Sequence, residues 1–112
     1  MIELNGLKYA PLTDIEQNYV IVRCSSAGVF AGYLKSKNSD SVVLHDARRL
    51  WYWSGAASLS QLAQEGVKKP DECKFPCTID IVELFGVIEI INCKEAARKN
   101  IANVPVWESK DA

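Results

Sequence analysis

Two adjacent arginines and three large aromatic rings lie in the short segment Asp46–Gly55, DARRLWYWSG. A guanidinium binds phosphate oxygens as a planar, permanently charged fork, and aromatic rings stack on unpaired bases. Arg48 and Arg49 are therefore the first candidates for binding the phosphates of a nucleotide. The alternative is a core strand with the tryptophans inward and the arginines paired to acids, and these residues on their own favour that alternative slightly.

A second cation and a turn could serve the same ligand. Arg23 lies next to a short break between two apolar runs, and this break consists of Ser25, Ser26, Ala27 and Gly28. Such a turn could present backbone N–H groups to an anion, beside the Arg23 guanidinium. A plain hairpin turn with no ligand is the more common outcome for this pattern.

Three further residues are candidates with ordinary alternatives. Phe75 precedes Pro76 in a polar loop and could stack on a base, or it could be a core contact. Lys68 and Lys69 are adjacent cations after a predicted helix, and such lysines are usually solvated.

The inventory of reactive side chains favours a binding protein over an enzyme. The chain has one histidine, His45, in an apolar run, where a structural role is more common than that of a general base. Its four cysteines lack paired zinc spacing, and its carboxylates lack the spacing of metal ligands. We expect no catalytic residue, no metal and no cofactor.

Length and charge limit the class of partner. The 112 residues suit one domain, 1–112, and the formal net charge of −1 offers no positive field for duplex nucleic acid. A small anion needs only a few placed arginines, so the charge permits a nucleotide. The start of the chain lacks the pattern of a signal peptide, and no segment has the length of a membrane span. We expect a protein of the cytoplasm that does not bind membranes.

The apolar pattern predicts an antiparallel sheet. β-Branched and aromatic residues at 19–25 and 29–34 predict a hairpin, and a third strand is expected to start at 41 and continue through 53. With unbroken pairing, Arg49, Trp51 and Trp53 share one face, whereas a bulge would exchange the faces beyond it. The two tryptophans are expected to hold the sheet and a dimer together rather than to touch ligand.

The remaining elements are two helices and a long apolar stretch. Ser58 and Gln61 have capping-box spacing, and Gly66 marks an end, so a short helix is predicted near 59–65 and anchored by Leu62. Residues 78–91 predict a strand pair, or one strand bent at Gly86, at the centre of the sheet. A second helix is predicted over 94–101. The fold class expected is α+β, a small antiparallel β-sheet with two short α-helices that oligomerises.

Four stretches of the chain resemble the bacteriophage Thoeris anti-defence sponges of the first type. They are YVIVR at 19–23, SAGVFAGYL at 26–34, ARRLWYWSGAASLSQLA at 47–63 and VPVW at 104–107. The likeness covers most of the chain, and the run 47–63 is the most specific part because it is long and unusual in composition.

This resemblance implies a non-catalytic protein of the host cytoplasm that sequesters cyclic ADP-ribose isomers (gcADPR) made by TIR-domain enzymes. The ligand is held intact, in a pocket with arginine and an aromatic ring near a subunit boundary. Members of the family form homodimers that can assemble into hexamers, and some also bind cyclic dinucleotides or trinucleotides of CBASS defence. If this chain does so, the resemblance implies a second pocket that Lys68 and Lys69 could line. Two alternatives stay open, an enzyme that degrades such a signal and an oligomeric adaptor without a ligand.

Overall fold

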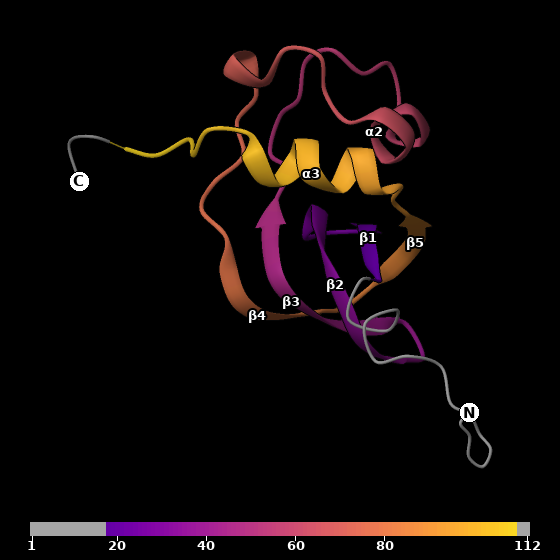
Figure 1. Ribbon diagram of the computed structural model, residues 1–112. Coiled ribbons are helices and arrows are strands. Elements are labelled where there is room, and N and C mark those ends of the chain that lie inside the picture. The colour runs from indigo at the N-terminus through magenta and orange to yellow at the C-terminus, as the bar shows by residue number, and fades with distance from the viewer. Residues whose placement is uncertain (1–17, 110–112) are drawn as a thin grey trace, which may run out of the picture.

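The computed structural model describes residues 18–109. Within this range the chain forms a five-stranded antiparallel sheet and two α-helices, which confirms the expected α+β class. The elements in chain order are β1 (Tyr19–Cys24), β2 (Gly28–Asn38), β3 (Ser41–Arg49), α2 (Leu59–Glu65), the short 3-10 helix η1 (Pro70–Glu72), β4 (Ile79–Leu84), β5 (Val87–Asn92) and α3 (Glu95–Asn103). Figure 1 shows both α-helices at one end of the curved sheet.

The sheet is curled, because strands that are consecutive in the chain lie at its two opposite ends. The strand order is β4-β3-β2-β1-β5, yet only Phe85 and Gly86 connect β4 to β5. The β1–β2 turn and the β2–β3 turn both contact this connection. The Ser25 N–H donates to the Gly86 carbonyl at 2.9 Å, and the Val87 N–H donates to the Asp40 carbonyl at 2.9 Å. Such a short connection requires the two ends of the sheet to approach each other.

Each face of the curled sheet covers a separate hydrophobic core. Alternation along β1 sends Tyr19 and Ile21 towards the helices and Val20 and Val22 into the curl. The helix-side cluster contains Tyr19, Ile21, Ala31, Leu50, Leu62, Ala63, Val67, Cys73, Phe75, Ile101 and Val104. The inner cluster contains Val20, Val22, Cys24, Phe30, Val42, Leu44, Ala47 and Leu84. Because both faces of β1 are covered, this strand is the most deeply buried of the sheet.

Two predictions about the strands are corrected. Residues 78–91 do form a strand pair, but β4 and β5 occupy the two edges of the sheet rather than its centre. The centre belongs to β1, β2 and β3, because β1 pairs with both β2 and β5. Strand β3 ends at Arg49 and does not continue through Trp53. Beyond it, Tyr52 makes only an isolated antiparallel bridge to Lys74.

A bulge near the end of β3 decides which way its arginines point. Asp46 has a positive φ of 49°, and the pairing with β2 shifts there, from Tyr33 opposite His45 to Ala31 opposite Arg48. Between these two pairs, one residue of β2 thus opposes two residues of β3, which exchanges the faces beyond the bulge. Both Ala47 and Arg48 are buried as a result, one on each side of the sheet.

Candidate functional site

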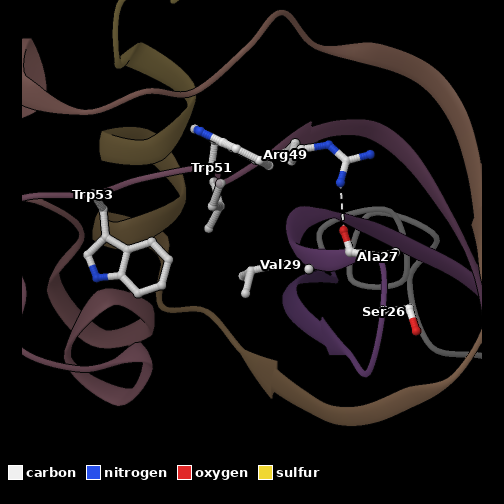
Figure 2. A pocket seen from close by; sticks show the side chains of 8 residues that line it. Ser26, Ala27, Val29, Arg49, Trp51 and Trp53 are labelled. Carbon is white, nitrogen blue, oxygen red and sulfur yellow. Dashed lines mark hydrogen bonds between the residues drawn. The ribbon is translucent and has the colours of Figure 1, made fainter.

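A cavity lies between the β1–β2 turn and the segment that follows β3. It has a volume of about 440 Å³ and is lined by Ser26, Ala27, Gly28, Val29, Arg49, Leu50, Trp51 and Trp53. We call this cavity the Arg49 pocket. Figure 2 shows the Arg49 guanidinium next to the Ala27 carbonyl, with the Trp53 ring on the far side of Val29. The pocket thus brings four of the predicted site residues together.

Arg49 is held in a fixed position while part of its guanidinium stays available. One terminal nitrogen donates to the Ala27 carbonyl at 2.6 Å, and the guanidinium carbon lies 4.3 Å from the centre of the Phe30 ring. These two contacts fix both the plane and the direction of the group. A guanidinium carries five N–H donors, so others remain for an anion in the pocket.

The β1–β2 turn forms the opposite wall of the pocket. Gly28 has a φ of +92°, a backbone conformation that a residue with a side chain rarely adopts. Ser26, Ala27 and Gly28 line the cavity as predicted, whereas Ser25 is outside the lining and its N–H is bonded to Gly86. The turn therefore supplies three of the four predicted site residues that line the pocket.

Trp51 and Trp53 line the same pocket as Arg49, but strand alternation does not account for this, because β3 ends at Arg49 and Leu50 lines the pocket as well. Sequence reasoning assigned the two tryptophans to the sheet and a dimer, and the path of the chain after β3 brings them to this site. Trp51 is mostly exposed, while Trp53 packs partly against the helix-side core. Val29 and Leu50 add an apolar floor that sequence reasoning missed.

Arg48 is corrected from a phosphate ligand to a structural residue. Its side chain is buried, at 3% exposure, and its guanidinium donates to four backbone carbonyls. These carbonyls, at 2.8 to 3.0 Å, belong to Phe75, Pro76, Ile101 and Val104. Burial lowers the pKa of Arg48. Four of the five donors are thus used inside the protein, and Arg48 ties the end of α3 to the loop before β4.

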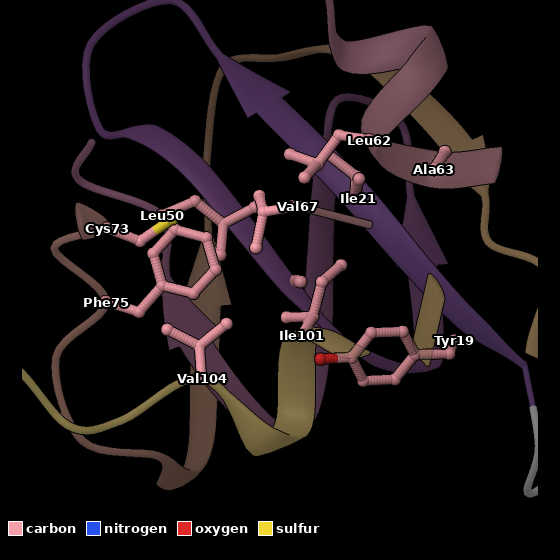
Figure 3. Packing of buried hydrophobic residues seen from close by; sticks show 11 residues of the cluster. Tyr19, Ile21, Leu50, Leu62, Ala63, Val67, Cys73, Phe75, Ile101 and Val104 are labelled. Carbon is pink, nitrogen blue, oxygen red and sulfur yellow. The ribbon is translucent and has the colours of Figure 1, made fainter. Parts of the chain in front are cut away.

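Phe75 is also corrected, from a base-stacking ring to its alternative, a core contact. Figure 3 shows its ring between Leu50, Cys73 and Val104 in the helix-side cluster, and its exposure is 0%. The Arg48 guanidinium lies 5.5 Å from the ring centre. Because the Phe75 ring is fully buried, a base cannot stack on it.

Arg23 lies outside the Arg49 pocket, on the opposite side of β1 from the inner core. It pairs with Glu89 on the neighbouring strand β5, where Nε lies 2.9 Å from Oε1. Both side chains are roughly half exposed. Arg23 does not line the Arg49 pocket, so the structure does not bring it to the other predicted site residues.

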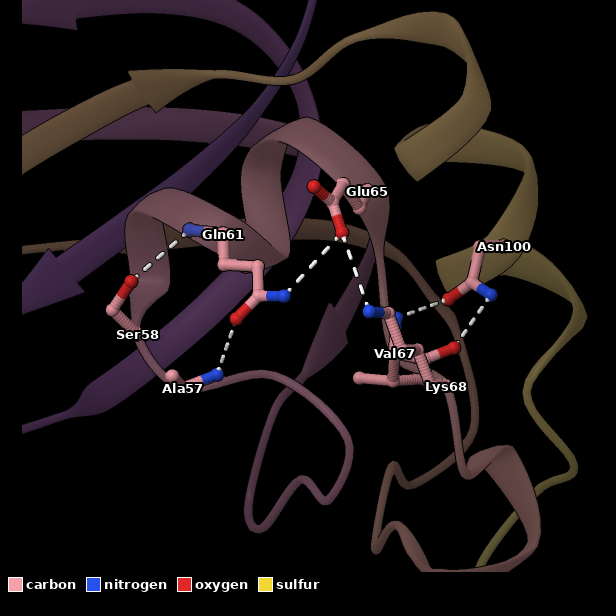
Figure 4. A network of polar contacts seen from close by, with 7 residues as sticks. All are labelled: Ala57, Ser58, Gln61, Glu65, Val67, Lys68 and Asn100. Atoms are coloured by element: carbon pink, nitrogen blue, oxygen red, sulfur yellow. Dashed lines mark hydrogen bonds and ion pairs between the residues drawn. The ribbon is translucent and has the colours of Figure 1, made fainter.

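Lys68 and Lys69 follow helix α2 and do not line the Arg49 pocket. Helix α2 begins as predicted: Ser58 accepts from the Gln61 N–H, and Gln61 accepts in turn from the Ala57 N–H (Figure 4). The Lys68 ammonium is exposed and lies 3.9 Å from the Glu65 carboxylate. The backbones of the two lysines instead pack on Gly55, where a Cβ atom would approach the Lys68 nitrogen to 2.6 Å.

The lining of the Arg49 pocket contains one ionised side chain, that of Arg49. Arg49 also affects the pKa of the Cys24 thiol in the inner core. Burial raises this pKa, and the nearby Arg49 charge partly opposes the rise. Chemically, the pocket offers one guanidinium, two indole rings and the backbone of a glycine turn. This combination suits an anion that carries a flat ring.

Residues 18–109 contain no group of three or more histidine, cysteine, aspartate or glutamate side chains arranged to hold a metal ion. No helix in the described part of the chain has both the length and the apolar character needed to cross a membrane.

Fold and site together define a small α+β protein with a curled sheet and an arginine–tryptophan pocket. A family model described as a domain of unknown function, DUF6948, matches residues 17–101, and the chain belongs to this family. The match includes the whole sheet, α2, most of α3 and every residue that lines the Arg49 pocket. Comparison with curated proteins and with solved structures gave no match.

Proposed function

We propose that this protein is a phage anti-defence sponge that binds cyclic ADP-ribose isomers in the Arg49 pocket and sequesters them without cleaving them. The observation that supports the proposal best is the meeting of Arg49, Trp51 and Trp53 at one cavity. In the host cytoplasm, sequestration of this signal would keep the Thoeris effector from sensing it.

The chemistry of the ligand matches the lining residue by residue. The free N–H groups of Arg49 would donate to a phosphate, and an indole of Trp51 or Trp53 would stack on the adenine ring. Polar groups of the Ser26–Gly28 turn would meet ribose hydroxyls. A volume of about 440 Å³ lies within the range of small-molecule sites, roughly 300–1,000 Å³.

The charge of the pocket supports a homo-oligomeric sponge. Cyclic ADP-ribose carries two phosphates, whereas the described lining provides the single cation of Arg49. Nanomolar binding, which corresponds to about −12 kcal/mol, demands near-complete enclosure of so small a ligand. We therefore propose that a second protomer, in a homodimer or a hexamer, completes the site. Closed symmetry would then give equal sites on each protomer.

A capture experiment tests the proposal. The protein is mixed with the product of an active TIR enzyme and filtered, and the retained fraction is heated and analysed by mass spectrometry. Recovery of unchanged cyclic nucleotide is expected. An opened product would favour the alternative of a degrading enzyme, and a retained fraction without nucleotide would favour a ligand-free adaptor.

Competition extends the test to cyclic dinucleotides and trinucleotides. If Lys68 and Lys69 contribute a second pocket, a cyclic oligonucleotide binds without displacing cyclic ADP-ribose from the Arg49 pocket. Displacement would assign both ligands to one site, and absence of oligonucleotide binding would remove this part of the proposal.

A further inference from the structure

Strand β4 forms an edge of the sheet and exposes large apolar side chains. Within the described residues it pairs with β3 on one side only, because it ends the strand order. Ile79, Ile81 and Phe85 are 40%, 61% and 64% exposed. Ile79 and Ile81 are two positions apart in β4, so they project from one face of the strand, and Phe85 follows directly after it. We call them, together with the free backbone edge of β4, the β4 edge.

Such an edge is unusual for a protein that stays monomeric. Edge strands expose unpaired N–H and C=O groups, and proteins usually protect them with proline, a bulge or inward charges. Only Asp80 and Glu83 of β4 carry exposed charges that could protect this edge from pairing. Ile81, which lies between them, is apolar and exposed. The register with β3 is regular over four consecutive positions, from Val42 opposite Leu84 to His45 opposite Ile81.

We infer that the β4 edge pairs with the β4 edge of a second copy, antiparallel and across a twofold axis. With the axis at Ile81, this residue lies opposite its own counterpart. Asp80 then lies opposite Val82 of the second copy, and Glu83 lies opposite Ile79. Each acid thus faces an apolar residue, and no acid lies directly opposite another.

An axis one residue further along gives the same result. With the axis at Val82, Asp80 lies opposite Leu84 of the second copy and Glu83 lies opposite Ile81. Like charges directly opposite each other destabilise a strand pair, so the spacing of the two acids permits self-pairing in both alignments. A C2 interface needs this self-complementarity, because the same surface serves both partners.

The charge of the whole chain does not oppose the association. A formal net charge of −1 produces little long-range repulsion between two copies. The inference takes from the proposed function only that the chain self-associates, and it adds a contact surface separate from the Arg49 pocket, whose lining contains no residue of β4. Ligand capture and self-association are measured separately, so either can fail alone.

Sedimentation velocity over a range of protein concentrations tests the inference with a pair of matched variants. Ile81→Asp would place an aspartate opposite another aspartate or opposite Glu83. Ile88→Asp makes the same change on the other edge strand, β5, at a side chain that is 55% exposed. The wild type and Ile88→Asp are expected at twice the 12.4 kDa mass of the chain, and Ile81→Asp at half that value, as a monomer.

Three results would overturn the inference: a monomeric wild type, a dimeric Ile81→Asp variant, or dissociation by both substitutions. Hydrogen exchange of the wild-type protein keeps the test decisive if Ile81→Asp does not fold. The amides of β4 that point away from β3 are expected to be protected in the dimer and to lose protection on dilution. Equal exchange at all concentrations would also overturn the inference.

Discussion

Arg48 and Arg49 are neighbours in the chain, yet they lie in opposite environments. Arg48 is buried and bonded to four backbone carbonyls, whereas Arg49 lies at a cavity with one carbonyl partner and an aromatic ring beneath it. The comparison teaches that an arginine beside aromatic residues has two distinct uses. One satisfies the carbonyls at the end of a helix, and the other presents a charge to a ligand.

The largest effect is expected from Arg48→Ala. Removal of the guanidinium leaves four carbonyls without their donor, and a buried acceptor without a partner costs about 1–3 kcal/mol. We expect a loss of at least about 3 kcal/mol in the free energy of unfolding. Urea denaturation followed by circular dichroism measures it. Wild-type stability in this variant would show that the carbonyl network is dispensable.

Arg49→Ala is expected to act on binding instead of stability. The loss of a charge-assisted contact to phosphate, worth about 1.5–3 kcal/mol, lowers affinity roughly 10- to 100-fold. Calorimetric titration with cyclic ADP-ribose measures the change. Arg23→Ala is the control, because Arg23 forms an exposed pair with Glu89 outside the pocket and should leave affinity unchanged. Unchanged affinity in Arg49→Ala would remove the pocket from the proposal.

Phe75→Leu sharpens the contrast between core and pocket. The ring is fully buried, so the substitution should lower the free energy of unfolding by about 1–2 kcal/mol. Capture of the ligand should persist in the folded variant, because a leucine still fills the core. If Phe75 instead stacked on a base, capture would be lost while the protein remained folded, and the capture assay separates these outcomes.

Alkaline pH should weaken the helix-side core. Burial raises the pKa of Cys93 from 9.0 to about 11, and it raises the pKa of Tyr19 as well. A folded-state pKa above the unfolded value gives stability that is present below pH 9.0 and is lost as the pH rises towards about 11. Thermal melts between pH 8 and pH 11 should therefore show a falling midpoint. Cys93→Ala should flatten this fall.

The smallest effect is expected from Lys68→Ala and Lys69→Ala. The Lys68 ammonium is exposed and 3.9 Å from Glu65, a contact worth less than about 1 kcal/mol. Stability should stay within about 0.5 kcal/mol of wild type, and cyclic ADP-ribose should bind equally well. Isothermal titration and urea denaturation measure both quantities. A loss of cyclic ADP-ribose affinity would extend the pocket towards α2.

Local chemistry made several parts of the molecule predictable. Helix α2 could be located because Ser58, Gln61 and Gly66 are capping residues whose effect depends on near neighbours. The hairpin at the Ser26–Gly28 turn follows from two apolar runs separated by a few turn residues. The near-neutral formal charge of −1 could also be read from the composition, because charge is a property of the residues themselves.

Only the tertiary structure decided which arginine is buried and which strands form the edges. The bulge at Asp46 turns Arg48 towards α3, where the carbonyls of Ile101 and Val104 come from a segment more than fifty positions away. The apolar composition of 78–91 suits a central strand equally well, but the curl of the sheet places this stretch at both edges. Both outcomes depend on contacts between distant segments, and the periodicity of a single segment carries no information about such contacts.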